Sequence, residues 1–234
     1  MSRLVLIFLH LFAASILAAD DPMRTCRILF LNPPENAPEK MYLSDGSSAL
    51  EVELARMSFS PVYEIRVEAE WLALLSSEPA GSGAGRLAPF PENTPVVKLD
   101  SGVLDFYLIV TSDGRPEHPP LKLQVIRADG ENFVRGKMLW YNLTDHKVGG
   151  QLGKRKLLLG GRSRKVVDAP ADDIEEYRVS LYFQPPGSDS AEPLCETAWS
   201  HDPRSRTVFF VIQPQGAMIP RVIGIPDFRG DEDQ

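Results

Sequence analysis

Cysteine is scarce in this sequence, with Cys26 and Cys195 the two among 234 residues. Two thiols permit at most one intramolecular disulfide, which excludes the disulfide-dense scaffolds of small secreted domains. Histidine is scarce too, and none of the four forms an H-E-x-x-H sequence. The chain also lacks a G-x-S-x-G elbow and a P-loop. The common signatures of metalloproteases, serine hydrolases and nucleotide-binding proteins are therefore missing.

Basic residues are outnumbered, 25 Lys and Arg against 32 Asp and Glu, which gives a net charge of −7. Because nucleic-acid binding needs an excess of Lys and Arg, we expect no nucleic-acid partner. Long apolar runs are missing after the N-terminal segment, and a bilayer span needs roughly 20 such residues. We therefore expect no membrane span in the mature chain.

The N-terminus carries the one long apolar run. Arg3 precedes a run from Leu4 to Leu17, and the small residues Ala18 and Ala19 follow it. This order is typical of a secretory signal peptide, predicted here as residues 1–19. We expect the remainder to be exported, to the periplasm, the cell surface or the extracellular space.

Turn formers are abundant, with 20 prolines and 17 glycines, so few windows can hold an ordinary helix. Between them lie short runs rich in Val, Ile, Leu, Phe and Tyr, a pattern typical of a β-sandwich. Strands are predicted at 26–31, 40–43, 50–54, 62–67, 71–75, 96–99, 103–111, 121–127, 137–143, 148–152, 155–159, 164–168, 177–184, 194–199, 206–212 and 220–225.

Residues 48–57 and 64–75 also fit a helix, because the first has a capping box and the second is rich in helix formers. Both also alternate apolar and polar residues, so we interpret them as strands. Residues 106–110 (FYLIV) and 208–212 (VFFVI) are apolar on both faces, which suits central strands.

A short pattern occurs twice, as RILFLN at 27–32 and as KMLWYN at 137–142. After each copy the same order of strands follows, with a Gly/Pro/Ser-rich excursion and a closing pair of strands. This predicts duplication of one unit. We expect a first unit at 20–128, a short linker at 129–136, a second unit at 137–228 and an acidic tail at 229–234.

The motifs MSFSPVYEI, MLWYNLT, VVDAP, PLCETAW and HDPRSRTVFFV resemble an uncharacterised family of exported bacterial proteins with tandem immunoglobulin-like sandwiches. The resemblance covers nearly all of the mature chain. It implies a fold rather than a reaction, and it carries over no catalytic residue. The expected fold class is all-β, with two tandem immunoglobulin-like antiparallel β-sandwich units and little helix.

Two features point to chemistry at the cysteines. In an exported protein, Cys26 and Cys195 can form a disulfide that staples the two units together. The alternative is two buried free thiols that act as small apolar side chains. Cys195, His201, Met218 and His146 follow the order of blue-copper ligands, but their spacing is too loose for one ligand loop.

Charge is unevenly placed in the second unit, because residues 147–165 hold seven basic residues and no acid. One interpretation is a face for envelope polysaccharide or an acidic partner. The other is edge-strand lysines that discourage aggregation, with neighbouring acids as partners. The candidate ligand-binding residues are Lys154, Arg155, Lys156, Arg162, Arg164 and Lys165, together with Trp199.

Three tryptophans are candidates for stacking on sugars. Trp140 lies inside an apolar strand and is predicted to be in the core, whereas Trp199, at a strand end, is the best candidate for exposure. Together these patterns predict a non-catalytic exported cell-envelope protein, an adhesive, scaffold or accessory module without a cofactor. The alternatives are a glycan- or polyanion-binding module that uses 147–165, and a hydrolase or metal-binding protein.

Overall fold

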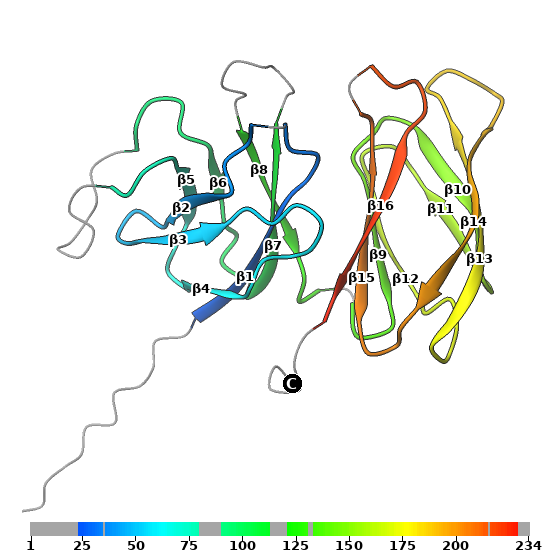
Figure 1. The fold of residues 1–234 in the computed structure, drawn as a ribbon, viewed down its shortest axis with the longest axis horizontal. Coiled ribbons are helices and arrows are strands. Elements are labelled where there is room, and N and C mark those ends of the chain that lie inside the picture. The colour runs from blue at the N-terminus through cyan, green and yellow to red at the C-terminus, as the bar shows by residue number, and fades with distance from the viewer. Residues whose placement is uncertain are drawn as a thin grey trace, which may run out of the picture.

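The chain folds into β-strands, and the described part contains no helix. The computed structural model describes residues 23–34, 36–79, 90–112, 121–130, 133–214 and 216–228 (Figure 1). The predicted signal peptide at 1–19 and the acidic tail at 229–234 lie outside these residues. None of the described elements is a helix long and apolar enough to cross a membrane.

Eight strands form the first unit, in two sheets. One sheet has the order β4-β1-β7-β8 and the other β3-β2-β5-β6. The strands are β1 (Met23–Phe30), β2 (Lys40–Ser44), β3 (Ala49–Glu53), β4 (Tyr63–Arg66), β5 (Trp71–Leu75), β6 (Val96–Lys98), β7 (Asp105–Ser112) and β8 (Leu121–Arg127).

Eight further strands form the second unit. Its sheets have the orders β12-β9-β15-β16 and β11-β10-β13-β14. The strands are β9 (Met138–Asn142), β10 (Lys147–Leu152), β11 (Arg155–Leu159), β12 (Arg164–Val167), β13 (Glu175–Gln184), β14 (Glu192–His201), β15 (Arg206–Ile212) and β16 (Arg221–Asp227).

The two units have the same strand order. Adding eight to each strand number in the sheets of the first unit gives the sheet orders of the second unit. Each unit also contains one parallel pair, β1 with β7 and β9 with β15, among antiparallel neighbours. The predicted all-β class with two tandem sandwich units is confirmed. Within each unit the first strand lies between the fourth and the seventh, whereas in the constant-type immunoglobulin sheet it lies beside the second.

Each of the sixteen predicted strand ranges overlaps one observed strand. The two segments that also fitted a helix form strands: 48–57 contains β3, and 64–75 contains β5 and all of β4 except Tyr63. A turn interrupts the second segment, where the N–H of Ala69 donates to the carbonyl of Arg66 at 3.1 Å. Pairing with neighbouring strands therefore overrides the helix propensity of both segments.

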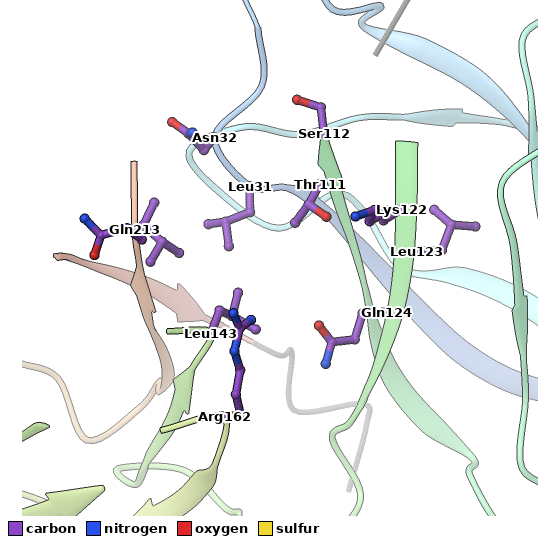
Figure 2. A pocket seen from close by; sticks show the side chains of 11 residues that line it. Leu31, Asn32, Thr111, Ser112, Lys122, Leu123, Gln124, Leu143, Arg162 and Gln213 are labelled. Atoms are coloured by element: carbon purple, nitrogen blue, oxygen red, sulfur yellow. The ribbon is translucent and has the colours of Figure 1, made fainter. Parts of the chain in front are cut away.

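The sheet β4-β1-β7-β8 packs against β12-β9-β15-β16, so the molecule is a stack of four sheets with three apolar layers (Figure 1). The middle layer lies between the units, and Figure 2 looks into one end of it. Full burial of one large apolar side chain is worth about 1.5–3 kcal/mol. The many buried side chains of this layer therefore hold the two units against each other.

The middle layer explains why β7 and β15 are apolar on both faces. Phe106, Leu108 and Val110 of β7 face the core of their own unit. Tyr107 and Ile109, which alternate with them, face the second unit. Both strands are central in their sheets, as predicted.

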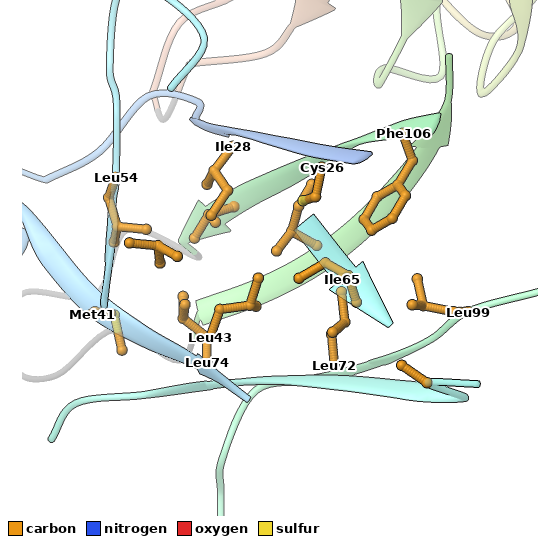
Figure 3. Packing of buried hydrophobic residues seen from close by; sticks show 14 of the residues in the cluster. Cys26, Ile28, Met41, Leu43, Leu54, Ile65, Leu72, Leu74, Leu99 and Phe106 are labelled. Atoms are coloured by element: carbon orange, nitrogen blue, oxygen red, sulfur yellow. The ribbon is translucent and has the colours of Figure 1, made fainter. Parts of the chain in front are cut away.

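The outer layers are the cores of the individual units. Figure 3 shows the first, where Cys26 and Ile28 of β1 face Leu72 and Leu74 of β5. The second unit's core includes Trp140, which is 0% exposed. The predicted core position of Trp140 is confirmed.

Of the two alternatives left open for the cysteines, the disulfide is not formed. Cys26 and Cys195 are both free. Cys26 is buried in the core of the first unit, while Cys195 packs at the edge of the second unit's core, so two sheets and the middle layer separate them. Burial raises the pKa of the Cys26 thiol, which favours its inert protonated form. The alternative interpretation, a buried free thiol that acts as a small apolar side chain, describes Cys26, whereas Cys195 is a half-buried free thiol.

A buried polar network crosses the middle layer. Asp227, 1% exposed, ends β16 and accepts hydrogen bonds from Arg27 and Tyr107 of the first unit. The Nε of Arg206 donates to the same carboxylate at 2.9 Å. Burial of a carboxylate requires such compensation.

Arg206 extends this network into the first unit. Its Nη2 lies 3.1 Å from Asp105, and its Nη1 donates to the carbonyls of Ala128 and Phe133 at 3.0 and 3.2 Å. The guanidinium also lies over the Phe133 ring, 4.9 Å from the centroid. The predicted linker thus contributes a buried aromatic residue and a hydrogen-bond acceptor to the contact between the units.

Candidate ligand-binding cleft

An aromatic cleft opens at one side of the second unit, between the edge strands β14 and β16. Each strand is the last of its sheet. On β14, Thr197 and Trp199 point into the space between the sheets, and Val222 and Gly224 of β16 line the same space. The cleft is therefore the open side of this sandwich.

A stack of three aromatic rings forms the wall of the cleft. Trp199 stacks on Phe209 at 5.1 Å between centroids, and Phe209 stacks on the buried Trp140 at 4.5 Å. Tyr177, the cross-strand neighbour of Trp199, meets it edge-on at 6.3 Å. Because Trp140 and Phe209 are held by the core, Trp199 is presented on a rigid support.

Gly224 makes room for this stack. It pairs with Phe209 across β15 and β16, and a Cβ added to it would lie 2.6 Å from an edge carbon of the Phe209 ring. A glycine inside a strand is typical of such a close approach. The ring position and the glycine therefore depend on each other.

Trp199 separates two adjoining hollows, of about 490 and 380 Å³. Each is within the usual size of small-ligand pockets. Large apolar side chains stand at the rim of the first, where Ile174 is 63% and Phe228 57% exposed. Ser200, Ser205 and Thr207 supply hydroxyl groups to the same hollow. The cleft thus combines ring faces with hydrogen-bonding groups.

His201 lies at the end of β14 beside the first hollow and is 6% exposed. Its Nε2 is buried and finds no hydrogen-bond partner in the described part of the chain. Burial lowers the pKa of His201, against the opposing effect of Asp202, Glu175 and Asp172. A neutral imidazole with an unsatisfied nitrogen is a candidate hydrogen-bonding group for a ligand or a water.

Asp202 follows His201 and organises the turn after β14. The N–H and Nε of Arg204 donate to its carboxylate at 2.9 and 3.0 Å, and these bonds lower the pKa of Asp202 to about 2. The N–H of Ser205 donates to the Asp202 carbonyl at 3.1 Å. Asp202 therefore stays ionised near neutral pH and shapes the mouth of the cleft.

The tryptophans differ from expectation in one respect. Trp199 lines the cleft but is half-buried, and Trp71 is the more exposed, at 46%. Trp71 lies on β5 in the first unit, with the Lys98 ammonium 5.9 Å from its ring centroid. The core of the first unit, the sheet β4-β1-β7-β8, the middle layer and the sheet β12-β9-β15-β16 lie between it and the cleft.

The predicted basic set lies on the other side of the second unit. Lys154, Arg155 and Lys156 belong to β11 and the turn before it, and β11 is the sheet edge opposite β14. Lys154 pairs with Asp172 at 2.5 Å, and Arg155 donates to the carbonyl of Ala169 at 2.9 Å. These two are engaged locally, and Trp199 is not among their neighbours.

The remaining basic residues point in different directions. Arg162 pairs with Asp145 at 2.8 Å. On β12, Arg164 lies opposite Tyr141 and Lys165 opposite Trp140. Because adjacent strand residues point to opposite faces, Arg164 points toward the first unit. Lys165 points to the face of the sheet that covers the second unit's own core. The structure does not bring the six residues onto one face.

Sequence reasoning missed the members of the cleft that come from β13, β15 and β16. Phe209 lies in a fully apolar run that indicates a core position, as does Tyr177 in its alternating strand. Gly224, in RVIGIP, was a usable signal, because a strand glycine indicates that another group approaches the backbone. Its partner ring could not be named without the pairing of β15 and β16.

No cluster of three or more His, Cys, Asp or Glu side chains suited to a metal ion occurs in the described ranges. Searches for similar proteins give no family assignment: no protein-family model matches the chain, and no curated protein matches it.

Proposed function

We propose that this is a non-catalytic exported protein of the cell envelope, an adhesive, scaffold or accessory module, whose second unit binds a glycan in the aromatic cleft. The envelope part of the proposal rests on the resemblance to exported bacterial proteins with tandem immunoglobulin-like units. The observation that carries the binding part is the stack of Trp140, Phe209 and Trp199, which ends at the two hollows.

The chemistry of the cleft suits a saccharide. Aromatic faces take the apolar C–H faces of sugar rings, while hydroxyl and imidazole groups hydrogen-bond to sugar hydroxyls. Two hollows on either side of Trp199 suit consecutive residues of a linear chain. The rigid stack and the four-sheet architecture support binding without a large loss of conformational freedom.

The test is calorimetric titration of the full chain with neutral oligosaccharides, namely cellohexaose, chitohexaose and maltohexaose. We expect one of them to bind and Trp199→Ala to weaken its binding at least tenfold, about 1.4 kcal/mol. Trp71→Ala is the matched control, because it removes an exposed tryptophan from the other unit. Absence of binding to all three, or an equal loss in both variants, contradicts the proposal.

A polyanion-binding module is the second candidate. Lys156 and Lys165 support it, because neither makes an ion pair within the described ranges and both are exposed. Salt-sensitive retention on an acidic polysaccharide column would be reduced when Lys154, Arg155 and Lys156 are changed to Ser. Retention that is unchanged in this variant removes the second candidate.

A further inference from the structure

A second cleft, of about 530 Å³, lies at one end of the middle layer (Figure 2). Both units build it: β7, β8 and the end of β1 contribute from the first, and the ends of β9 and β15 with the turn before β12 from the second. Leu31, Leu143 and Ile212 provide its apolar lining. It shares no lining residue with the aromatic cleft.

The polar lining is rich in donors. Lys122 and Arg162 are the cations, and no carboxylate lines the cleft among the residues that the structure describes. The Lys122 side chain makes no ion pair or hydrogen bond with any described residue. Figure 2 shows Lys122, Gln124 and Arg162 around the same opening. A donor-rich site with two cations is complementary to an anion.

Two side chains on this rim are held in place. Arg162 presents its Nε and Nη2 to Asp145 at 2.8 and 3.4 Å, which leaves its Nη1 edge for another acceptor. Gln124 donates from its Nε2 to the Tyr141 hydroxyl of the other unit at 2.7 Å, which leaves its amide oxygen as an acceptor. The rim is therefore largely ordered before a ligand enters.

Backbone conformation supports the same interpretation. Asn32 and Arg162 have φ values of 54° and 50°, in the left-handed region that residues with a Cβ rarely adopt. Both line this cleft, one from each unit. Such conformations gather at ligand sites more often than elsewhere.

We propose that the inter-unit cleft binds an acidic saccharide. Its carboxylate, sulfate or phosphate group lies between Lys122 and Arg162, its hydroxyls contact the amides of Gln124 and Gln213, and its ring packs on the leucines. The mixture of cations, amides and apolar floor favours a sugar acid over a bare inorganic anion, which would leave the floor unused.

The test is calorimetric titration of the full chain with trigalacturonate, a sulfated heparin disaccharide and glucose 6-phosphate, which separate the three anionic groups. We expect at least one to bind with an affinity that falls as salt rises. Lys122→Gln and Arg162→Gln should each weaken it at least fivefold. Lys122→Gln removes no ion pair or side-chain hydrogen bond within the described residues, so its result stands even if Arg162→Gln impairs folding.

Lys98→Gln is the matched control and should leave the affinity unchanged, because Lys98 is an exposed lysine on β6 that does not line this cleft. Trp199→Ala should also leave it unchanged, which separates this site from the glycan site proposed above. The proposal is overturned if no acidic saccharide binds, if the control weakens binding as much as Lys122→Gln, or if sodium phosphate or sulfate binds as tightly as the saccharides.

Discussion

The middle layer and the aromatic cleft lie on opposite faces of the same sheet, β12-β9-β15-β16. The first unit covers one face, whereas the other face is open at the side of the second unit. Phe210 of β15 points to the first unit and is sealed by it. Phe209, the preceding residue, points to the second unit's own core and stacks on Trp199 at the open side. One residue step along a strand therefore separates a structural contact from a candidate binding surface.

The two units also differ at their sides. In the first, the edge strands β6 and β8 approach each other, whereas in the second β11 and β12 do so and β14 and β16 flank the cleft. β14 has ten residues, against three in its counterpart β6. Repetition of a strand order therefore does not repeat the surface, because the edges of each sandwich close differently.

The largest effect is expected in the buried polar network of the middle layer, at Asp227. Asp227→Ala leaves Arg27 and Arg206 without their buried partner, so the free energy of unfolding should fall by about 3–5 kcal/mol. Urea unfolding of the full chain measures it. Asp168→Ala is the control, because its carboxylate pairs with Lys137 at 3.3 Å while 59% exposed, and should cost below about 1 kcal/mol. Equal losses would contradict a buried role for Asp227.

A smaller loss is expected where the cleft depends on close packing. Gly224→Ala places a Cβ 2.6 Å from the Phe209 ring, which must shift, at a cost of about 1–3 kcal/mol. Gly102→Ala is matched, because nothing lies within 4 Å of its added Cβ. Near-ultraviolet circular dichroism should report a disturbed aromatic stack in the first variant alone. An unchanged spectrum and stability in Gly224→Ala would show that the stack is not rigid.

The pH dependence of stability should distinguish the cleft from the rest of the molecule. Burial lowers the pKa of His201 in the folded state below its ordinary value of 6.5. The unfolded chain then binds more protons below that value, so the stabilising contribution is complete above pH 6.5 and is lost as pH falls. Unfolding of wild type and His201→Gln between pH 7.5 and 5 should show the steeper loss in wild type. Parallel curves would contradict it.

The smallest effect is expected at the basic edge far from the cleft. Lys154→Ser removes an exposed ion pair with Asp172, so the free energy of unfolding should change less than in any of the variants above. Thermal unfolding in low and high salt measures it, and the difference should vanish in high salt. A larger loss that persists in high salt would indicate that this edge is part of the folded core.

Prediction from sequence succeeded where the physical cause was local. Strands repeat every two residues and turns need Gly or Pro, so all sixteen strands were found. The doubly apolar runs also indicated central strands correctly. The sequence does not tell which sheet covers each face of a strand. Phe209 was therefore predicted as a core residue, although it supports the cleft.

The disulfide shows the same limit. Cys26 and Cys195 satisfy the compositional rule for an exported protein, but a bond requires their Cα atoms to lie within about 7 Å. That distance depends on the packing of four sheets, which neither residue's neighbours in sequence encode.

Alternation and turn chemistry thus decided the strands, their repetition and the burial of Trp140, because each depends on residues close together in the chain. Packing between sheets decided the sealed middle layer, the free thiols, the open side at β14 and β16, and the meeting of Lys122 with Arg162. Those outcomes depend on contacts between residues far apart in sequence, which exist only once the whole stack has formed.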